Sequence, residues 1–298
     1  MLLNMKELLK VAKENRFAVG AFNVADSNFL RAVVEEAEES NSPAIIAIHP
    51  DEFEFLTDEF FAYVRERAGN SSTPFVLHLD HGASLDQVVR AIRAGFTSVM
   101  IDGSLLPYDE NVEKTRKVVE IAHMVNVSVE GELGTIGDTG TTVEGGVSEI
   151  TYVDPEDVED FIAKTNVDTL AVAVGTAHGI YPKDVKPKLQ LELIEDIVNR
   201  VDTPLVLHGG SSNPDKEVAR AVKIGIQKVN ISSDMKFAFY KKAREILSTT
   251  ELWDPNAIFP ECIDAARDVI RYKMDLFEST NKAGLYSGSE SKYLLETK

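Results

Sequence analysis

The chain has 298 residues, with 31 Lys or Arg against 49 Asp or Glu, which gives a net charge of −18 at pH 7. So acidic a protein is poorly suited to bind nucleic acid or an anionic membrane, and we expect neither as a partner. The single cysteine, Cys262, excludes an internal disulfide and a cysteine-rich metal site. The sequence has no uninterrupted apolar run of about 18 residues and no signal-peptide pattern, which predicts a cytoplasmic protein.

A helix is predicted over residues 5–14, and short apolar runs then alternate with amphipathic stretches. Strands are predicted at 18–24, 44–49, 75–79, 98–101, 128–133, 169–174, 205–208 and 227–231. Helices are predicted between them at 27–39, 84–94, 108–125, 154–165, 191–201 and 215–224. Alternating strands and helices indicate a parallel sheet. Eight strands in a chain of this length favour an α/β fold of the (β/α)₈ TIM-barrel type.

Three segments depart from a plain barrel. The helix at 5–14 precedes the first strand, and a further helix is predicted at 260–279 as a C-terminal helical extension. The segment 134–150 contains five glycines, and a loop this long in a compact domain is usually either functional or disordered. We see no linker, so we expect a single domain over 1–298 with a polar tail from about residue 281.

Three histidines stand at or just past the C-terminal ends of predicted strands. They are His81, His178 and His208, and in a parallel barrel these ends form the catalytic face. Three neutral imidazoles with an open fourth position are a typical set of ligands for a catalytic zinc. The alternative for each is a structural, hydrogen-bonded histidine. We interpret the other three histidines, His49, His78 and His123, as structural, although His78 stands two residues before Asp80, at the spacing that places two side chains on one strand face.

Other polar groups gather at the same strand ends. Asp80 would place an acid/base beside the metal, whereas Asp102 and Glu132 could equally be helix caps or salt-bridge partners. Gly- and Ser-rich segments at 209–212 and 230–233 follow the seventh and eighth strands. Barrels commonly bind phosphate there through backbone N–H groups, although ordinary turns with serine caps are the alternative.

Six motifs occur in order and at matching spacing: LDHG, VMIDGS, VEGELG, AVGTAHG, LVLHGGS and KVNISSDMK. Together they resemble the class II, metal-dependent fructose/tagatose-bisphosphate aldolase family, over residues 5 to 282. The resemblance implies a zinc-dependent TIM barrel that forms a dimer or a larger homo-oligomer. It also implies reversible cleavage of a ketose 1,6-bisphosphate to dihydroxyacetone phosphate and glyceraldehyde 3-phosphate. Fructose 1,6-bisphosphate is the first choice of substrate.

The resemblance also implies roles for individual residues. His81, His178 and His208 match the zinc ligands, Asp80 matches the acid/base for the C4 hydroxyl proton, and Asp102 and Glu132 match a second metal position. Contacts to the phosphorylated substrate are expected from Asn23, Gly179, Gly209, Gly210, Ser211, Asn230, Ile231, Ser232 and Ser233. Backbone carbonyls near Gly179 and Gly209 match the place where the family holds a monovalent cation, Na⁺ or K⁺.

Four departures from the family pattern bear on details. The family's Gly-Gly-x-Glu-Asp motif, whose glutamate moves the C–H proton, is replaced here by GTIGDTGTTVEGG. Glu144 and Asp138 are candidates for that role, and we prefer Glu144, although neither is in the expected register. Ser212 stands where glycine is common. Ser232 stands where fructose-preferring members often have Asp or Asn, and His49 replaces a small hydroxyl residue near the substrate.

Other functions remain open at this point. The substrate could be tagatose 1,6-bisphosphate, another phosphorylated ketose or a deoxy-ketonate. A barrel metallohydrolase and a catalytically silent sugar-phosphate sensor are the non-aldolase alternatives. A Schiff-base aldolase is disfavoured because the predicted sixth strand has no lysine, and Lys228 is expected at the opposite end of the barrel.

Overall fold

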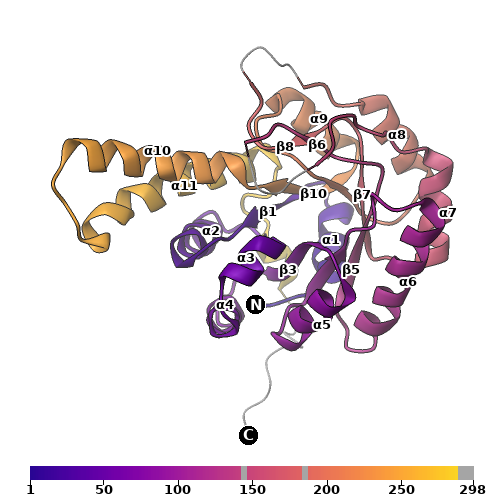
Figure 1. Ribbon diagram of the computed structural model, residues 1–298, viewed down its shortest axis with the longest axis horizontal. Coiled ribbons are helices and arrows are strands. Elements are labelled where there is room, and N and C mark those ends of the chain that lie inside the picture. Colours follow the sequence, from indigo (N-terminus) through magenta and orange to yellow (C-terminus); the bar gives the residue numbers. More distant parts are fainter. Residues whose placement is uncertain (142–145, 183–186, 288–298) are drawn as a thin grey trace, which may run out of the picture.

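The computed structural model describes residues 1–141, 146–182 and 187–287. Within them, eight parallel strands close into a barrel in the order β1, β10, β9, β7, β5, β4, β3, β2 (Figure 1). The barrel strands are β1 (Val19–Asn23), β2 (Ala44–Ile48), β3 (Phe75–Gly82), β4 (Ser98–Ile101), β5 (Ser128–Leu133), β7 (Thr169–Val172), β9 (Leu205–Leu207) and β10 (Ile226–Ile231). Val19 of the first strand pairs with Lys228 of the last, which closes the barrel. The predicted TIM barrel is confirmed.

Helices surround the barrel or extend from it. They are α1 (Met5–Glu14), α2 (Ser27–Glu39), α3 (Pro50–Phe55), α4 (Asp58–Gly69), α5 (Leu85–Arg93), α6 (Tyr108–His123), α7 (Pro155–Thr165), α8 (Leu191–Arg200), α9 (Asp215–Ile224), α10 (Ser233–Thr249) and α11 (Pro255–Leu276). The barrel strands are buried almost throughout because helices cover one face and interior side chains fill the other. The sequence interpretation did not identify α3 and α4, which lie between β2 and β3.

The N-terminal end of the barrel is closed by α1. Leu8 and Leu9 of this helix pack with interior side chains of the strands, including Val19 and Val76. A short 3₁₀-helix, Ala283–Tyr286, adds Tyr286 to this cluster, and the Tyr286 hydroxyl donates to the Leu8 carbonyl at 2.9 Å. The predicted tail therefore packs against α1 as far as it is described, and residues 288–298 lie outside the described part.

The C-terminal extension is a helical hairpin. Helices α10 and α11 project from the barrel as an arm, drawn in orange in Figure 1. The far half of α11 returns to the barrel and packs on α2, where Arg267 and Arg271 pair with the buried Glu36. The predicted helix at 260–279 begins earlier, at Pro255, which occupies the first turn, and Pro260 lies inside the helix.

The glycine-rich segment 134–150 is not a plain loop. Its residues Gly137–Asp138 form β6, which pairs in parallel with β8 (Ala177–His178) above the barrel. Gly137 also forms a bridge with Val147. Strands of two residues are too short to show a hydrophobic period, so the sequence could not reveal this small sheet.

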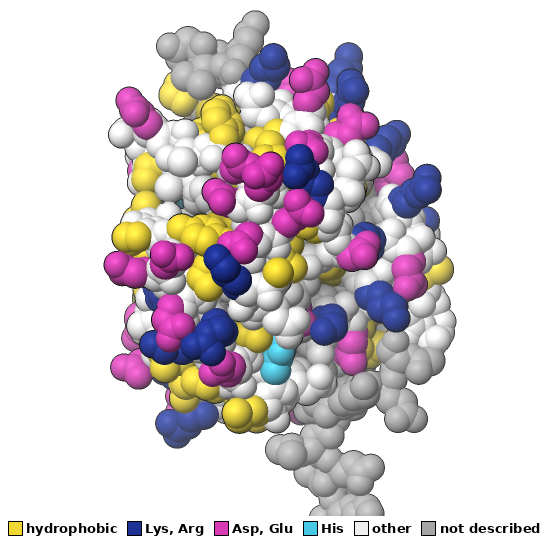
Figure 2. Space-filling view, turned by 90° about the vertical axis from the view of Figure 1, so that its right-hand side faces the viewer, with side chains coloured by type: hydrophobic (Ala, Val, Ile, Leu, Met, Phe, Trp, Pro, Cys, Tyr) yellow, Lys and Arg dark blue, Asp and Glu magenta, His cyan; other side chains and the backbone are white. Residues whose placement is uncertain are grey.

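The outer surface carries charges of both signs. On the face that bears α6 and α7, acidic and basic side chains are interspersed (Figure 2). No helix in the described ranges is long and apolar enough to cross a membrane.

Candidate active site

Three histidines converge at the C-terminal end of the barrel. His81 lies on β3, His178 on β8, and His208 directly after β9. Their ring nitrogens can be chosen so that all lie within 4.8 Å of one another. The ring centroids of His81 and His208 are 4.5 Å apart, and those of His81 and His178 are 5.1 Å apart. Three side chains from separate strands thus meet in a geometry suited to one metal ion.

A bulge in β3 allows two adjacent residues, Asp80 and His81, to reach the site. The pairing with β4 shifts register between Leu79 and Gly82, and His81 has a φ of 52°. Left-handed backbone is uncommon for a non-glycine residue and often marks a functional position. A bulge re-aims side chains that strict alternation would send to opposite faces.

Asp80 is a buried carboxylate held by two amides. Its two oxygens accept hydrogen bonds from the Nδ2 atoms of Asn23 and Asn230, each at 3.0 Å. Burial acts to raise the pKa of Asp80, but the neighbouring charges of His81 and Lys228 hold it well below its usual value. The group is therefore fixed and ionised, as a proton acceptor must be.

Two further carboxylates, those of Asp102 and Glu132, lie beside the ring of His81. The Nδ1 atom of His81 is 3.0 Å from Asp102 Oδ2 and 3.6 Å from Glu132 Oε2. This Glu132 oxygen is buried and has no hydrogen-bond partner among the described residues. Burial and the charge of Asp102 raise the pKa of Glu132 well above its usual value. An orphaned carboxylate oxygen beside three imidazoles fits a site that is completed by a divalent cation.

Inside the barrel, His208 is held by a hydrogen bond to Glu130, which is itself paired with Lys228. The sequence interpretation assigned no role in the site to either residue. The Nε2 atom of His208 lies 2.8 Å from Glu130 Oε1, and Glu130 in turn binds Lys228 at 2.7 Å. Lys228 is thus inside the barrel beneath the site, and the expectation that it lies at the opposite end was wrong. Its inward direction could have been inferred from alternation, because Lys228 stands two residues before Asn230.

A narrow polar cavity adjoins the histidines on the side of β9 and β10. Its lining includes Asn23, Asp80, His81, His178, Gly179, Gly209, Ser211, Asn230, Ser232 and Ser233. The hydroxyl of Ser232 and the Oδ1 atom of Asn230 are buried without a hydrogen-bond partner among the described residues. Such unsatisfied polar atoms suit a hydroxylated or anionic ligand.

Two predicted contact residues do not line this cavity. The Gly210 amide donates to the Asn230 carbonyl at 3.0 Å, so it is already engaged within the protein. The Ile231 side chain is buried in the apolar core. Glycine is nevertheless required at position 210, since a Cβ there would meet Val229 Cγ1 at 2.5 Å.

Of the two candidates for C–H proton transfer, Glu144 and Asp138, the structure describes only Asp138. Glu144 lies outside the described residues. Asp138 lies on β6 opposite His178, is exposed, and accepts a hydrogen bond from the Gly140 amide at 2.7 Å.

The remaining histidines have hydrogen-bond partners. His49 caps α3, with its ring centroid 6.1 Å from that of His81. Burial, followed by the charge of Lys228, lowers the pKa of His78 to about 3, so its ring is neutral. His123 is bound to Asp168 at 2.8 Å.

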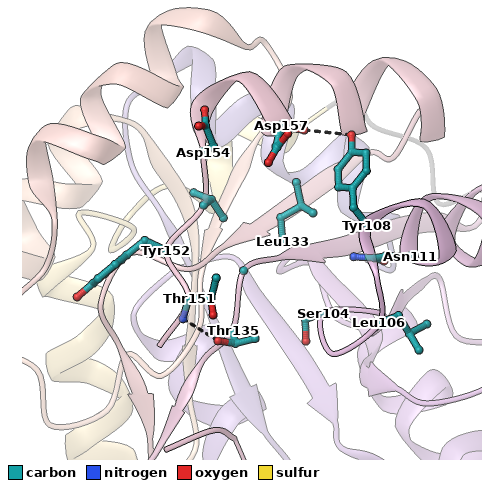
Figure 3. Close-up of a pocket in the computed structure, with 12 residues that line it drawn as sticks. Ser104, Leu106, Tyr108, Asn111, Leu133, Thr135, Thr151, Tyr152, Asp154 and Asp157 are labelled. Carbon is teal, nitrogen blue, oxygen red and sulfur yellow. Dashed lines mark hydrogen bonds between the residues drawn. The ribbon is translucent and has the colours of Figure 1, made fainter. Parts of the chain in front are cut away.

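A second cavity, of about 220 Å³, opens beside the site (Figure 3). Its walls are the β4–α6 loop, the end of β5 and the segment that leads to α7. Ser104, which lines it, donates to Asp102 at 2.7 Å and so connects this cavity to the carboxylates near His81. None of the three converging histidines lines it.

A closed parallel barrel with such a cluster at the carboxyl ends of its strands is typical of a metal-dependent barrel enzyme. The family described as fructose-bisphosphate aldolase class-II matches residues 3–282. The chain belongs to this family of class II aldolases, which are metal-dependent lyases.

This chain is similar in sequence to aldolases that carry two different names. A fructose-bisphosphate aldolase of Staphylococcus aureus (strain Mu50) is 38% identical over 288 residues, covering 95% of this chain and 99% of the relative. A 6-phospho-5-dehydro-2-deoxy-D-gluconate aldolase of Bacillus licheniformis is 39% identical over 288 residues, covering 94% and 96%. The crystal structure of the YdjI aldolase from Escherichia coli K12 superposes with a TM-score of 0.82 at 28% identity, covering 95% of this chain and 100% of that one.

Proposed function

We propose that the protein catalyses zinc-dependent, reversible cleavage of a ketose 1,6-bisphosphate, with fructose 1,6-bisphosphate as the first choice. The products are dihydroxyacetone phosphate and glyceraldehyde 3-phosphate. The observation that carries this proposal is the convergence of His81, His178 and His208 beside the fixed carboxylate of Asp80. The three imidazoles would hold the zinc, which supplies Lewis acidity toward the ketone oxygen when bound. Asp102 and Glu132 would offer a second metal position.

The proton chemistry follows from the position of Asp80. In the cleavage direction its carboxylate takes the proton of the C4 hydroxyl, the C3–C4 bond breaks, and the aldehyde leaves. The bonding electron pair stays with the dihydroxyacetone phosphate half as an enediolate, which must then be protonated at C3. We assign this second proton transfer to Glu144. Asn23 and Asn230 keep the Asp80 carboxylate in place through their 3.0 Å hydrogen bonds.

The narrow cavity beside the histidines supports binding of the phosphorylated end. Gly179, Gly209, Ser211, Ser232 and Ser233 line it and offer small side chains, hydroxyls and nearby backbone amides. We place the contacts expected from Gly210 and Ile231 at their backbones. A monovalent cation, Na⁺ or K⁺, is proposed at the backbone carbonyls near Gly179 and Gly209.

A second substrate assignment is favoured by the Bacillus licheniformis relative, whose name denotes a deoxy-gluconate phosphate. Tagatose 1,6-bisphosphate is a third. The test measures triose phosphate release from fructose and tagatose 1,6-bisphosphates, with 6-phospho-5-dehydro-2-deoxy-D-gluconate as a further arm, each with and without chelator. Turnover of 6-phospho-5-dehydro-2-deoxy-D-gluconate alone would keep the aldolase class but replace the proposed substrate. Absence of turnover with all three would favour the silent sensor or the metallohydrolase.

We further propose a cytoplasmic homo-oligomer, a dimer or tetramer, and one domain over 1–298. The arm supports oligomerisation because several large apolar side chains on it are exposed, namely Phe237, Tyr240, Leu247, Leu252 and Trp253. Light scattering of the purified protein measures the number of chains.

A further inference from the structure

A polar layer lies inside the barrel directly beneath the histidines. It contains Lys228 of β10, Glu130 of β5 and His78 of β3, and all three have 0% exposure. Each stands two residues before a group of the candidate site, so strand alternation directs it to the same interior one layer lower. Closer to the N-terminal end, the buried side chains include Val19 and Val76.

Lys228 and Glu130 form an ion pair inside this layer, where buried charges are rare. Removing two charges from water is costly, and replacing such a pair by apolar side chains of similar volume is often neutral or stabilising. Lys228 Nζ lies 2.8 and 2.7 Å from the two oxygens of Glu130, and 3.4 Å from His78 Nε2. The pair is therefore better explained by what it does for its neighbours than by fold stability.

Glu130 connects Lys228 to the candidate metal ligand His208. Its Oε1 atom lies 2.8 Å from His208 Nε2. An ionised carboxylate can only accept, so the hydrogen of His208 belongs on Nε2 and the lone pair on Nδ1. That Nδ1 atom faces the site, 2.8 Å from His81 Nε2.

We propose that Lys228 is a positioning residue for the metal centre, which holds Glu130 so that His208 presents Nδ1 to the metal. The inference rests on the proposed function, because it takes His208 as a zinc ligand. Both oxygens of Glu130 are fixed by the same ammonium group, which also lies 3.4 Å from the Nε2 atom of His78. Without Lys228, the carboxylate would lose its counter-charge and its fixed orientation, and His208 would lose a fixed acceptor.

The test compares zinc affinity, measured by competition with a chromophoric chelator on protein shown to be folded by circular dichroism. Lys228→Met should weaken zinc binding by about 10- to 100-fold, as loss of a group that orients a ligand typically does. Adding Glu130→Gln to this variant should restore most of the affinity, because the glutamine carbonyl can still accept from His208 Nε2 and no buried charge needs compensation. Adding Glu130→Leu instead removes the acceptor and should leave binding weak.

Lys273→Met is the matched control. Lys273 is also a buried lysine, paired with Asp234 at 2.8 Å, but it does not contact the histidines. The zinc affinity of the Lys273→Met variant should stay within about twofold of that of the parent protein. Parent-like affinity in Lys228→Met, or a loss of similar size in Lys273→Met, would overturn the proposal.

The two double variants keep the proposal testable if Lys228→Met alone does not fold. Both lack the buried charges, so equal zinc affinity in the glutamine and leucine versions would also overturn it. A parent protein that binds no zinc would instead contradict the proposed function, and this result is recognisable before any variant is compared.

Discussion

Asp80 shows how the barrel prepares a single side chain for proton transfer. It comes from β3, while the amides that hold it come from β1 and β10. These two strands are neighbours in the closed barrel, although they lie at opposite ends of the chain. The orientation of the carboxylate therefore depends on closure of the barrel as much as on its own strand.

We predict that Asp80→Ala keeps the fold and the zinc but lowers kcat by roughly 10²- to 10⁴-fold, the usual contribution of a positioned acid/base. Asp80→Asn is the closer control, because its amide oxygen can still accept from one of the two asparagines, and it should lose a similar factor. Steady-state kinetics with fructose 1,6-bisphosphate measures the effect. A loss below tenfold in both variants would show that the role belongs to another group.

Ser232 is the residue at which we predict weak sugar discrimination. Its buried hydroxyl faces the cavity without a partner among the described residues, and it is smaller than the Asp or Asn expected in fructose-preferring members. An unpaired buried polar group changes binding by on the order of 1–3 kcal/mol. Values of kcat/KM for fructose and tagatose 1,6-bisphosphates should therefore lie within about two orders of magnitude of each other.

A larger residue at position 232 provides the check. Ser232→Asp should raise the fructose-to-tagatose ratio of kcat/KM, and Ser232→Ala should not. If the parent already discriminates by more than about a thousandfold, another residue sets the preference. His49, whose ring lies near His81, is then the next to test.

At the scale of elements, the segment 134–150 is the part of the site for which sequence and structure give different information. The glycines suggest a mobile lid, whereas its described residues include β6, paired with β8 next to His178. The expected lid includes residues 142–145, which lie outside the described part of the chain.

We predict that Glu144 performs the C–H proton transfer from this segment. Glu144→Gln should abolish exchange of the dihydroxyacetone phosphate C–H proton with solvent while zinc remains bound, because the amide cannot accept the proton. Proton NMR of dihydroxyacetone phosphate in D₂O follows this step. Asp138→Asn is the paired variant, and loss of exchange there with normal exchange in Glu144→Gln would transfer the role to Asp138.

The strands and most helices could be predicted because burial on both faces leaves short apolar runs separated by amphipathic stretches. The histidines could be predicted because the C-terminal ends of parallel strands meet on one face. Helices α3 and α4 were missed, as was the small sheet, whose strands have two residues each. Lys228 was misplaced because its position near the start of its strand suggested the far end of the barrel, whereas its side chain is buried and pairs with Glu130.

For the whole molecule, the barrel is arranged in layers along its axis. Helix α1 and an apolar cluster close the N-terminal end, the layer of Lys228, Glu130 and His78 lies above them, and the histidines and Asp80 stand at the open end. The arm of α10 and α11 projects to one side of the barrel (Figure 1). This order separates the groups that stabilise the fold from those that meet substrate.

The most direct test of the account is zinc dependence of fructose 1,6-bisphosphate cleavage by metal-free protein. We predict that the protein binds about one zinc tightly per chain, that chelator abolishes triose phosphate release, and that added zinc restores it. Borohydride in the presence of substrate should trap no adduct. Cleavage that persists without metal, or a substrate trapped on a lysine, would contradict the account.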